Sequence, residues 1–436
     1  MIKNLEKLEK FLFYVFVFSI PFQIRKVLFC FSENFLEWNS GFLYFTDLLL
    51  IAVLCLAFLR KGLKIKKANI FLGLFFLIAL ISLITAQNIK ISFYHLIKLF
   101  EFLLLFLYIK QNIKIFKIPK LFSIFIASGV FQAIIAILQF FNQASLGLKH
   151  FEVGILNANI PGVATFFVNN HKFIRAYGTA PHPNVLAVFL LIAIFFLYYL
   201  YLYSKSTKIH RVILMICLAI LMLGLFLTFS RAVIIVFAGA SLAFLIITFF
   251  CINKIPRFKI IALFLLVLLF SGLIIGLLWP EISTRFSSFS TTEQAVTLRV
   301  YYNEIAWSAI KQNPLTGLGI GNFTWYLVNN YQLKEFWLYQ PVHNLYFLIA
   351  SELGIIALIL FLVFIGKILF KQTKKLFTKK ISLLELCVMG ALTSILFLGL
   401  VDHYLWTIQQ TCLLFWFVLA IACGLIFLNH NSKIKI

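Results

Sequence analysis

The stretch YQPVHNLYFLIASELG, at residues 339–354, is where a long polar segment gives way to a new apolar run. The polar segment begins at Trp279 and is the longest interruption in an otherwise apolar chain. The region from Trp279 to Gly354 contains Arg285, Arg299 and His343. Long ordered connections between apolar segments often carry binding or catalytic residues. The sequence therefore predicts that the functional site lies in this region.

The rest of the chain has the composition of a membrane protein. Of its 436 residues, 63% are hydrophobic, and the mean hydropathy is +1.02. This leaves too little polar surface to coat a soluble protein of this size. We predict an all-α polytopic membrane protein, a single transmembrane domain over 1–436 with about twelve helices of about 20 residues each. The expected spans are 9–30, 42–60, 69–87, 91–109, 118–141, 184–203, 211–229, 232–252, 259–278, 342–370, 382–401 and 405–428.

The basic residues predict how the chain is oriented in the membrane. The formal net charge is +24, but Lys and Arg lie in short clusters between the apolar runs, so nucleic acid is not an expected partner. Of the 38 Lys and Arg residues, 26 lie in every second connection between spans, counted from the N-terminus. The positive-inside rule assigns this side of the membrane to the cytoplasm. Both termini are then cytoplasmic. A second external loop at 143–183 and a large external loop at 279–341, between helices 9 and 10, face outward.

Three further features of the chain bear on its processing and cofactors. The first apolar run has no small-residue cleavage site, so we expect it to be retained as a span. The seven cysteines show no CxxC spacing, which indicates neither a disulfide framework nor a zinc site. The outer loops have no Asp-x-Asp element of the kind that binds divalent cations. The sequence predicts no metal and no cofactor.

Charged residues also occur within the predicted spans, where each costs roughly 2.5–3.5 kcal/mol if it faces lipid. Lys98 and Glu101 are three residues apart on one predicted helix. They can form an ion pair inside the bundle. They can also line a groove for a lipid substrate, and the sequence leaves both readings open.

Several polar residues are expected at the outer membrane boundary. Pro183 suits the first turn of the sixth helix, which places His182 and Arg175 at the outer face and Asn184 in the first turn. His182 can serve there as a cap or turn residue or can contact substrate. Arg231 stands at the start of the eighth helix, in a long apolar stretch. It can anchor the helix by snorkelling, but a guanidinium on this side is also suited to binding phosphate.

The large external loop has an internal organisation of its own. The sequence Ser290-Thr291-Thr292-Glu293 has the form of a capping box, and it predicts an amphipathic helix at about 291–312. Gly317, Gly319 and Gly321 follow as a predicted flexible turn. These glycines could let the loop move as a lid, or the loop could be a fixed cover over the bundle.

Two more polar pairs mark the outer ends of later helices. His343 and Asn344 open the tenth predicted helix, and Asp402 and His403 precede the last one. Glu352 lies nine residues after His343, about 13.5 Å along a continuous helix, so direct contact between them is not expected.

Four motifs resemble one known family. They are RAYGTAPHPNVLA at 175–187, FSRA at 229–232, TLRVYYNEIAWSAIKQNPLTGLGIGNF at 297–323 and PVHNLYFLIASELG at 341–354. Together with about twelve spans and one large external loop before the last three, they resemble the O-antigen ligase and O-antigen polymerase superfamily of bacterial envelope glycan transferases. The resemblance implies a fold like that of C-type glycosyltransferases.

The resemblance also implies an activity. Members move a glycan from a polyprenyl diphosphate carrier such as undecaprenyl diphosphate to an acceptor, at the outer face of the bacterial inner membrane, without an obligatory metal. The acceptor is lipid A core in lipopolysaccharide, another glycan, or a protein. The positions that match the family's diphosphate-binding arginines are Arg231 and Arg299, and His343 matches its catalytic histidine. The possible further substrate-binding residues are Arg175, His182, Asn184, Asn344, Asp402 and His403.

The chemistry is consistent with these residue types. Displacement at an anomeric carbon needs a base for the incoming hydroxyl and a stabiliser for the departing diphosphate. Histidine can supply the first and arginines the second. The open alternatives are a polysaccharide polymerase of the same superfamily, a cell-wall polymerase of the shape, elongation and division type, and a transporter or flippase for lipid-linked glycan. A scaffold is a poorer reading because it would give the charged outer residues no role.

Overall fold

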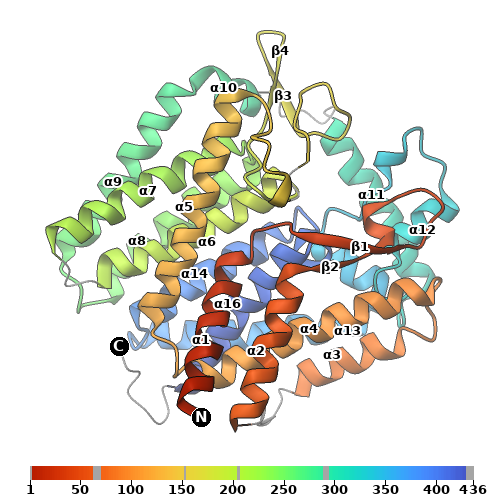
Figure 1. The fold of residues 1–436 in the computed structure, drawn as a ribbon, viewed down its shortest axis with the longest axis horizontal. Coiled ribbons are helices and arrows are strands. Elements are labelled where there is room, and N and C mark those ends of the chain that lie inside the picture. Colours follow the sequence, from red (N-terminus) through yellow and green to blue (C-terminus); the bar gives the residue numbers. More distant parts are fainter. Residues whose placement is uncertain (1, 62–69, 152–153, 204–206, 288–293, 429–436) are drawn as a thin grey trace.

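The structure is a computed structural model. It describes residues 2–61, 70–151, 154–203, 207–287 and 294–428. These residues form a helical bundle with two short hairpins (Figure 1). The first nine helices are α1 (Ile2–Ser19), α2 (Phe45–Lys61), α3 (Ile70–Ile81), α4 (Ile89–Asn112), α5 (Ile118–Asn142), α6 (Pro183–Tyr203), α7 (Lys208–Leu227), α8 (Arg231–Cys251) and α9 (Arg257–Leu277).

The remaining elements surround the large external loop and the C-terminal spans. The helices are α10 (Trp279–Ser287), α11 (Gln294–Gln312), α12 (Phe323–Asn330), α13 (Leu345–Phe377), α14 (Leu383–Leu398), α15 (Tyr404–Thr407) and α16 (Gln409–Leu428). Short 3-10 turns are η1 (Glu37–Asn39), η2 (Lys149–Phe151) and η3 (Phe336–Leu338). The strands are β1 (Arg25–Cys30), β2 (Ser40–Tyr44), β3 (Thr165–Val168) and β4 (His171–Ile174), and they pair antiparallel as β1–β2 and β3–β4.

The helices correspond closely to the predicted spans. Each predicted span overlaps one of α1 to α9, α13, α14 or α16. Within the described ranges, 8 helices are long and apolar enough to cross a membrane, namely α4 to α9, α13 and α16. α3 and α14 are apolar but shorter. The polytopic helical class is therefore supported, while the count of twelve spans stays a prediction.

The first predicted span, 9–30, is wrong at its C-terminal end. α1 ends at Ser19, and Arg25–Cys30 is strand β1, hydrogen-bonded to β2. Pro21 follows the helix and cannot donate a helical hydrogen bond. Arg25 then pairs with Glu37 of η1, with Nη2 to Oε2 at 2.8 Å. The apolar residues after Pro21 thus belong to a hairpin and not to a span.

The bundle is organised around α6 and α16. The most apolar stretches of these two helices are 94% and 100% buried, so other helices surround them on all sides. α16 packs against α4 and α14, and α6 packs against α5, α7 and α14. Small residues allow close approach, as membrane helices require. A Cβ added to Gly224 of α7 would lie 2.7 Å from the Cβ of Ala133 in α5.

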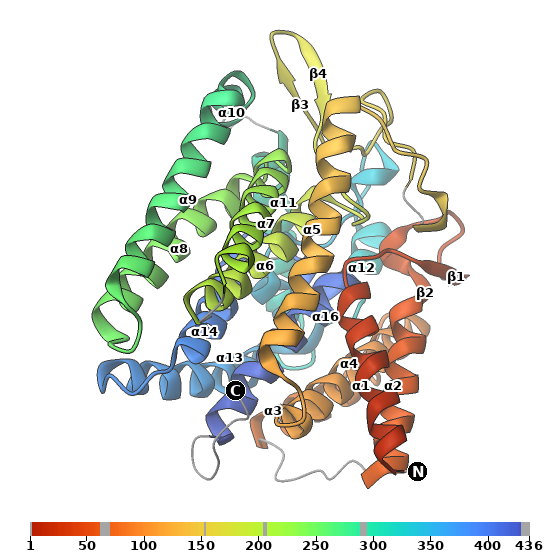
Figure 2. The ribbon, with the colours of Figure 1, turned by 60° about the vertical axis from the view of Figure 1, so that its left-hand side comes forward.

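Figures 1 and 2 show two flanks of the bundle. α8, α9 and α10 lie on one flank, and α1, α2, α4 and hairpin β1–β2 lie on the other. In both views α1 begins and α16 ends on the side away from the two hairpins. This arrangement agrees with an even number of crossings. Which side faces the cytoplasm stays a prediction.

The predicted ion pair of Lys98 and Glu101 is confirmed, with an addition. Lys98 Nζ lies 3.0 Å from Glu101 Oε2, and it also contacts Asp47 of α2. Asp47 Oδ1 accepts a hydrogen bond from Gln409 Nε2 at 2.7 Å. The three-residue spacing on one helix predicted Glu101 as the partner of Lys98. It could not predict Asp47 or Gln409, because these residues come from other helices.

The predicted flexible glycine turn is closely packed against α13 in the structure. α13 has a kink at Gly354, with φ 84° and ψ 168°, and the turn after α11 fits into this kink. Leu318 N donates to Ser351 O at 2.9 Å, and Gly319 N donates to Glu352 O at 3.0 Å. A Cβ at Gly317 would lie 2.3 Å from the backbone of Glu352. The glycines allow close packing, which favours a fixed cover over a moving lid.

The amphipathic helix predicted at about 291–312 corresponds to α11, which begins at Gln294. The capping box proposed at 290–293 lies outside the described residues. On its buried side α11 places Tyr302, Ile305 and Ala309 in a small core of its own, together with Val342 and Leu348. This core fixes the large loop to the start of α13. The helix therefore packs on the protein.

Candidate active site

A chain of hydrogen bonds joins three distant parts of the sequence at one place. Arg175 Nη2 donates to Asn184 Oδ1 at 2.6 Å, and Asn184 Nδ2 donates to Asp402 Oδ2 at 2.9 Å. The other oxygen of Asp402 lies 3.3 Å from His343 Nδ1. The loop before α6, the start of α13 and the α14–α15 turn thus meet at Asp402.

His343 is held in position by its neighbours on both sides. Asn344 caps α13 by accepting hydrogen bonds from the backbone N–H groups of residues 346 and 347, so the chain just before the helix has a fixed direction. His343 Nδ1 faces Asp402, and Nε2 lies 3.3 Å from Gln340 Oε1. The side chain of His343 is 20% exposed. The ring is therefore only partly buried.

His403 lies beside His343 but is more buried. The two rings are 4.8 Å apart. Nδ1 of His403 lies 2.7 Å from the hydroxyl of Thr407, and the ring meets Trp38 edge to face at 5.0 Å. Trp38 belongs to η1 in the N-terminal hairpin, so the first forty residues also contribute to the site.

Four arginines gather around this cluster. Arg231, the first residue of α8, donates from Nη1 to the backbone oxygen of Arg285 in α10 at 3.3 Å. Arg285 and Arg231 both act electrostatically on Arg175, and Arg299 of α11 acts on Asp402. Nε of Arg299 is buried and has no hydrogen-bond partner among the described residues. A buried donor of this kind is suited to an incoming hydrogen-bond acceptor.

The surroundings lower the pKa values of two residues of this chain of hydrogen bonds, Arg175 and Asp402. Burial and the nearby charge of Arg285 lower the pKa of Arg175 to about 9. Burial alone would raise the pKa of Asp402, but the hydrogen bond with His343 and the charges of His343, His403 and Arg299 hold it well below its usual range. Asp402 is therefore an anion at neutral pH, and the nearby guanidinium groups of Arg175, Arg231 and Arg285 repel one another.

The two buried histidines behave as neutral groups. Burial, followed by the charge of Arg175, lowers the pKa of His182 to about 3. Burial, followed by the charge of His343, lowers the pKa of His403 to about 3. Both rings are uncharged at neutral pH, so they can orient groups by hydrogen bonding.

His343, Asp402 and His403 lie close enough together to hold a metal ion, since their ligand atoms lie within 4.8 Å of one another. Their surroundings oppose a divalent cation. Arg299 acts on both Asp402 and His403, and Nδ1 of His403 is engaged by Thr407. These features favour a hydrogen-bonded network that faces an anion, and metal independence stays a prediction.

The structure brings most of the predicted site residues together. Asn344 is an exception, because its side chain caps α13 and donates to Leu400 O at 3.2 Å. His182 is a turn residue in part, because its Nδ1 accepts the backbone N–H of Asn184 at 3.1 Å. The predicted residues that join the cluster are Arg175, Asn184, Arg231, Arg299, His343, Asp402 and His403.

Three residues of the site were given no role by the sequence. Arg285 could have been found by the argument used for Arg231, since it is also an arginine on the predicted outer side. Gln340 directly precedes the motif that contains His343. Trp38 carried no local signal, because its contact with His403 spans most of the chain.

The fold and the site together define a class: a polytopic helical membrane protein with an arginine-rich pocket beside a histidine–aspartate pair. Residues 215–362 match the family model described as O-antigen ligase. This match confirms the resemblance to the O-antigen ligase superfamily, and it supports glycan transfer as the function. The matched segment contains Arg231, Arg299 and His343, while Arg175 and Asp402 lie outside it. No curated protein matches the chain.

Proposed function

We propose that this protein is a glycosyltransferase that moves a glycan from a polyprenyl diphosphate carrier to an acceptor at the outer face of the bacterial inner membrane. One observation carries the proposal: arginines from four separate elements lie near the His343–Asp402 pair, Arg299 and Arg175 interacting with Asp402, and Arg231 and Arg285 acting on Arg175. Guanidinium groups suit a diphosphate because each can donate two parallel hydrogen bonds. A histidine next to them supplies a base near neutral pH.

The geometry supports a direct displacement. Asp402 accepts a hydrogen bond from Nδ1 of His343, which fixes the ring and leaves Nε2 as the unprotonated nitrogen. Nε2 lies 3.3 Å from Gln340 Oε1, so the acceptor hydroxyl must take the place of this side chain before Nε2 accepts its proton. The acceptor hydroxyl gives its proton to Nε2, and its oxygen forms a bond to the anomeric carbon. The bond between that carbon and the diphosphate oxygen breaks, and the electron pair leaves with the polyprenyl diphosphate. His343 is the catalytic base, and Asp402 is a positioning residue.

The arginines take up the charge that develops on the leaving group. Negative charge grows on the bridging oxygen as the bond breaks, so donors fixed beforehand stabilise the transition state more than the ground state. Arg299 is suited to this task because its buried Nε has no partner among the described residues. Arg231 and Arg285 approach from α8 and α10, on one flank of the bundle. The carrier's tail can remain in the bilayer on that flank.

Transfer by the purified full-length protein in phospholipid vesicles tests this proposal. The substrates are lipid-linked glycan and acceptor extracted from the producing bacterium. Wild-type protein should transfer glycan, and His343→Gln should not. His171→Gln is the matched control, because His171 is exposed on β4 and lies outside the cluster. Equal turnover by His343→Gln and His171→Gln would show that His343 takes no part in the reaction.

A further inference from the structure

Helix α11 carries two buried polar atoms that make no hydrogen bond with the described residues. They are Nε of Arg299 and Oδ1 of Asn303. The two residues are four positions apart, so their side chains lie on the same face of the helix, one above the other. Most buried polar atoms in native proteins are hydrogen-bonded. A pair of exceptions on one face is suited to a ligand that supplies both partners.

This face of α11 lies beside the candidate active site. The ring of Tyr302, the residue before Asn303, is 6.1 Å from the ring of His343. The charge of Arg299 acts on Asp402. Because the Cα–Cβ bonds of a helix tilt toward its N-terminus, the side chain of Asn303 leans toward Arg299. Asn303 therefore lies next to the groups that the proposed reaction uses.

The two buried atoms need opposite partners. Nε of Arg299 is a donor, whereas Oδ1 of Asn303 is an acceptor and needs an incoming O–H or N–H group. An ionised diphosphate carries acceptor oxygens and no donor, so it can satisfy Arg299 but not Oδ1 of Asn303. The sugar bonded to that diphosphate has hydroxyl groups, which donate as well as accept. The sugar is therefore the part of the donor substrate that suits Asn303.

Another buried acceptor of the same kind is less well placed. Oε2 of Glu281 in α10 also makes no hydrogen bond with the described residues. However, α10 packs against α9 and β3, whereas α11 packs against α13, the helix that directly follows His343 and Asn344. Asn303 is thus the acceptor on the helix that adjoins the candidate catalytic residue.

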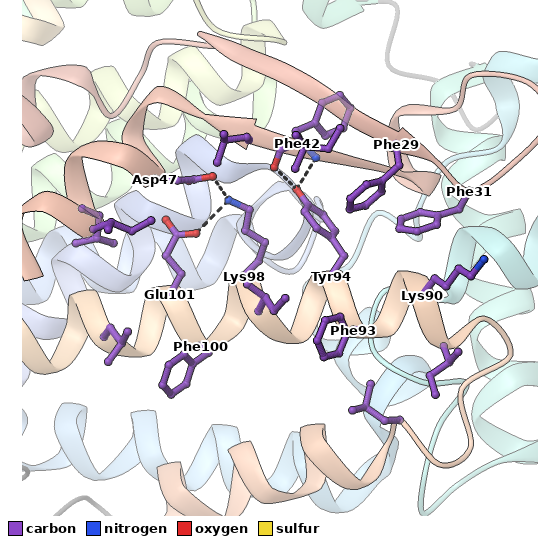
Figure 3. Close-up of a pocket in the computed structure, with 18 of the residues that line it drawn as sticks. Phe29, Phe31, Phe42, Asp47, Lys90, Phe93, Tyr94, Lys98, Phe100 and Glu101 are labelled. Carbon is purple, nitrogen blue, oxygen red and sulfur yellow. Dashed lines mark hydrogen bonds and ion pairs between the residues drawn. The ribbon is translucent and has the colours of Figure 1, made fainter. Parts of the chain in front are cut away.

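A large cavity elsewhere in the molecule differs in its polar groups. It has a volume of about 1010 Å³ and lies between hairpin β1–β2, α2 and α4 (Figure 3). Lys98 there bonds Asp47 and Glu101. The hydroxyl of Tyr94 bonds the backbone N–H and the backbone oxygen of Phe42, at 3.0 and 3.1 Å. These polar side chains already have partners and the walls are mainly hydrocarbon, so this cavity is poorly suited to a sugar.

We propose that Asn303 is a sugar-binding residue, whose Oδ1 accepts a hydrogen bond from a hydroxyl or amide N–H group of the first sugar on the carrier. This inference rests on the proposed function, and it gives the donor substrate a direction along α11. The diphosphate lies at Arg299, and the sugar lies one helical turn further, at Asn303. The bond that breaks then lies between these two residues, close to Tyr302 and His343.

Two carrier ligands, one with sugar and one without, test the proposal. The first is carrier-linked glycan extracted from the producing bacterium, and its transfer gives kcat/KM. The second is undecaprenyl diphosphate without sugar, whose inhibition constant against the first ligand is measured. The full-length protein in phospholipid vesicles is wild type, Asn303→Leu or Asn303→Ala. Glu304→Leu is the matched control, because Glu304 is the next residue of α11 and is exposed.

The expected result is a loss that depends on the sugar. Both variants of Asn303 should lower kcat/KM for carrier-linked glycan by about tenfold to a hundredfold, since a donor group of the sugar is left without its acceptor. The inhibition constant of the sugar-free carrier should equal that of wild type, which also shows that the variant is folded. Glu304→Leu should match wild type with both ligands, and Arg299→Lys should weaken the binding of both.

Other outcomes would overturn the proposal. Unchanged kcat/KM in both variants of Asn303 would show that Oδ1 does not bind the sugar. An equal loss with both ligands, in a variant that keeps the unfolding midpoint of wild type, would assign the amide of Asn303 to the diphosphate. Absence of transfer by wild type would refute the proposed function, and this proposal with it.

Discussion

Two clusters of charged residues in this protein differ in whether their charges are matched. In the first, Glu9 of α1 and Arg60 of α2 are paired, with Nε to Oε2 at 2.6 Å and Nη2 to Oε1 at 3.0 Å. Tyr108 and Asn112 of α4 complete the network, at 2.9 Å each. In the second, Arg299 keeps a buried Nε without a partner among the described residues. Arg175 there has a pKa lowered in part by other arginines.

This difference separates structural charge from functional charge. A buried pair with all its hydrogen bonds made is stable in a membrane, and removal of one partner is costly. A group of like charges with unused donors is unfavourable by itself, and it becomes favourable when an anion binds. We therefore expect changes to the first cluster to alter stability and changes to the second to alter transfer.

The largest expected effect is on catalysis. His343→Ala removes the base, and we expect glycan transfer to fall by about 10²- to 10⁴-fold. The midpoint of thermal unfolding should change little, because His343 is partly exposed and its partner Asp402 keeps the bond from Asn184. Transfer in vesicles and thermal unfolding in detergent measure the two quantities. Near wild-type turnover would refute the assignment.

The reverse pattern is expected for the matched cluster. Glu9→Ala leaves Arg60 buried without its counter-ion, which should lower the free energy of unfolding by about 3–5 kcal/mol. The double variant Glu9→Leu with Arg60→Met buries no charge, so its free energy of unfolding should fall by less than that of Glu9→Ala. Activity per folded molecule should equal wild type in both. If the single and double variants are equally stable, the burial of Arg60 does not require the charge of Glu9.

Arginine geometry should matter more than charge in the second cluster. Arg231→Lys and Arg299→Lys keep the charge but lose the planar fork, so we expect transfer to fall about tenfold to a hundredfold. Arg257→Lys is the control, since Arg257 begins α9 at the end of that helix away from α10. Normal transfer by both site variants would show that charge attraction is sufficient.

A smaller effect is expected in the pH dependence of stability. An unfolded histidine titrates near pH 6.5, whereas His403 in the fold has a pKa of about 3. The unfolded state therefore binds more protons between these values, and stability should fall as pH decreases through this window. His403→Gln should flatten the slope of the unfolding midpoint between pH 6.5 and 4. An unchanged slope would show that His403 is not buried as a neutral group.

The smallest expected effect is that of chelation. The carboxylate and imidazoles of the second cluster are surrounded by arginine, so we expect EDTA to leave the transfer rate unchanged. A loss of activity that Mg²⁺ or Zn²⁺ restores would show that His343, Asp402 and His403 form a metal site. That result would also make the arginine cluster a secondary feature.

The sequence by itself determined the helical membrane class and most of the helices. Length and hydropathy of each run are local properties, so they identify α4 to α9, α13 and α16 without knowledge of the fold. The sequence also singled out Arg231 and His343, because polar residues at the outer ends of apolar runs stand out against their neighbours. Arg299 was singled out through the resemblance to the O-antigen ligase superfamily, and the roles of all three stay predictions.

Only the tertiary structure decided which of these residues meet. Asp402 joins Asn184, which lies 218 positions earlier in the chain, and no local pattern encodes such a contact. The glycines after α11 have the sequence of a flexible turn, but in the structure this turn packs closely against the kink at Gly354 of α13. The hairpin after α1 has an apolar sequence but forms a cavity wall. Helix formation depends on neighbouring residues, whereas the site and cavity depend on the packing of helices far apart in sequence.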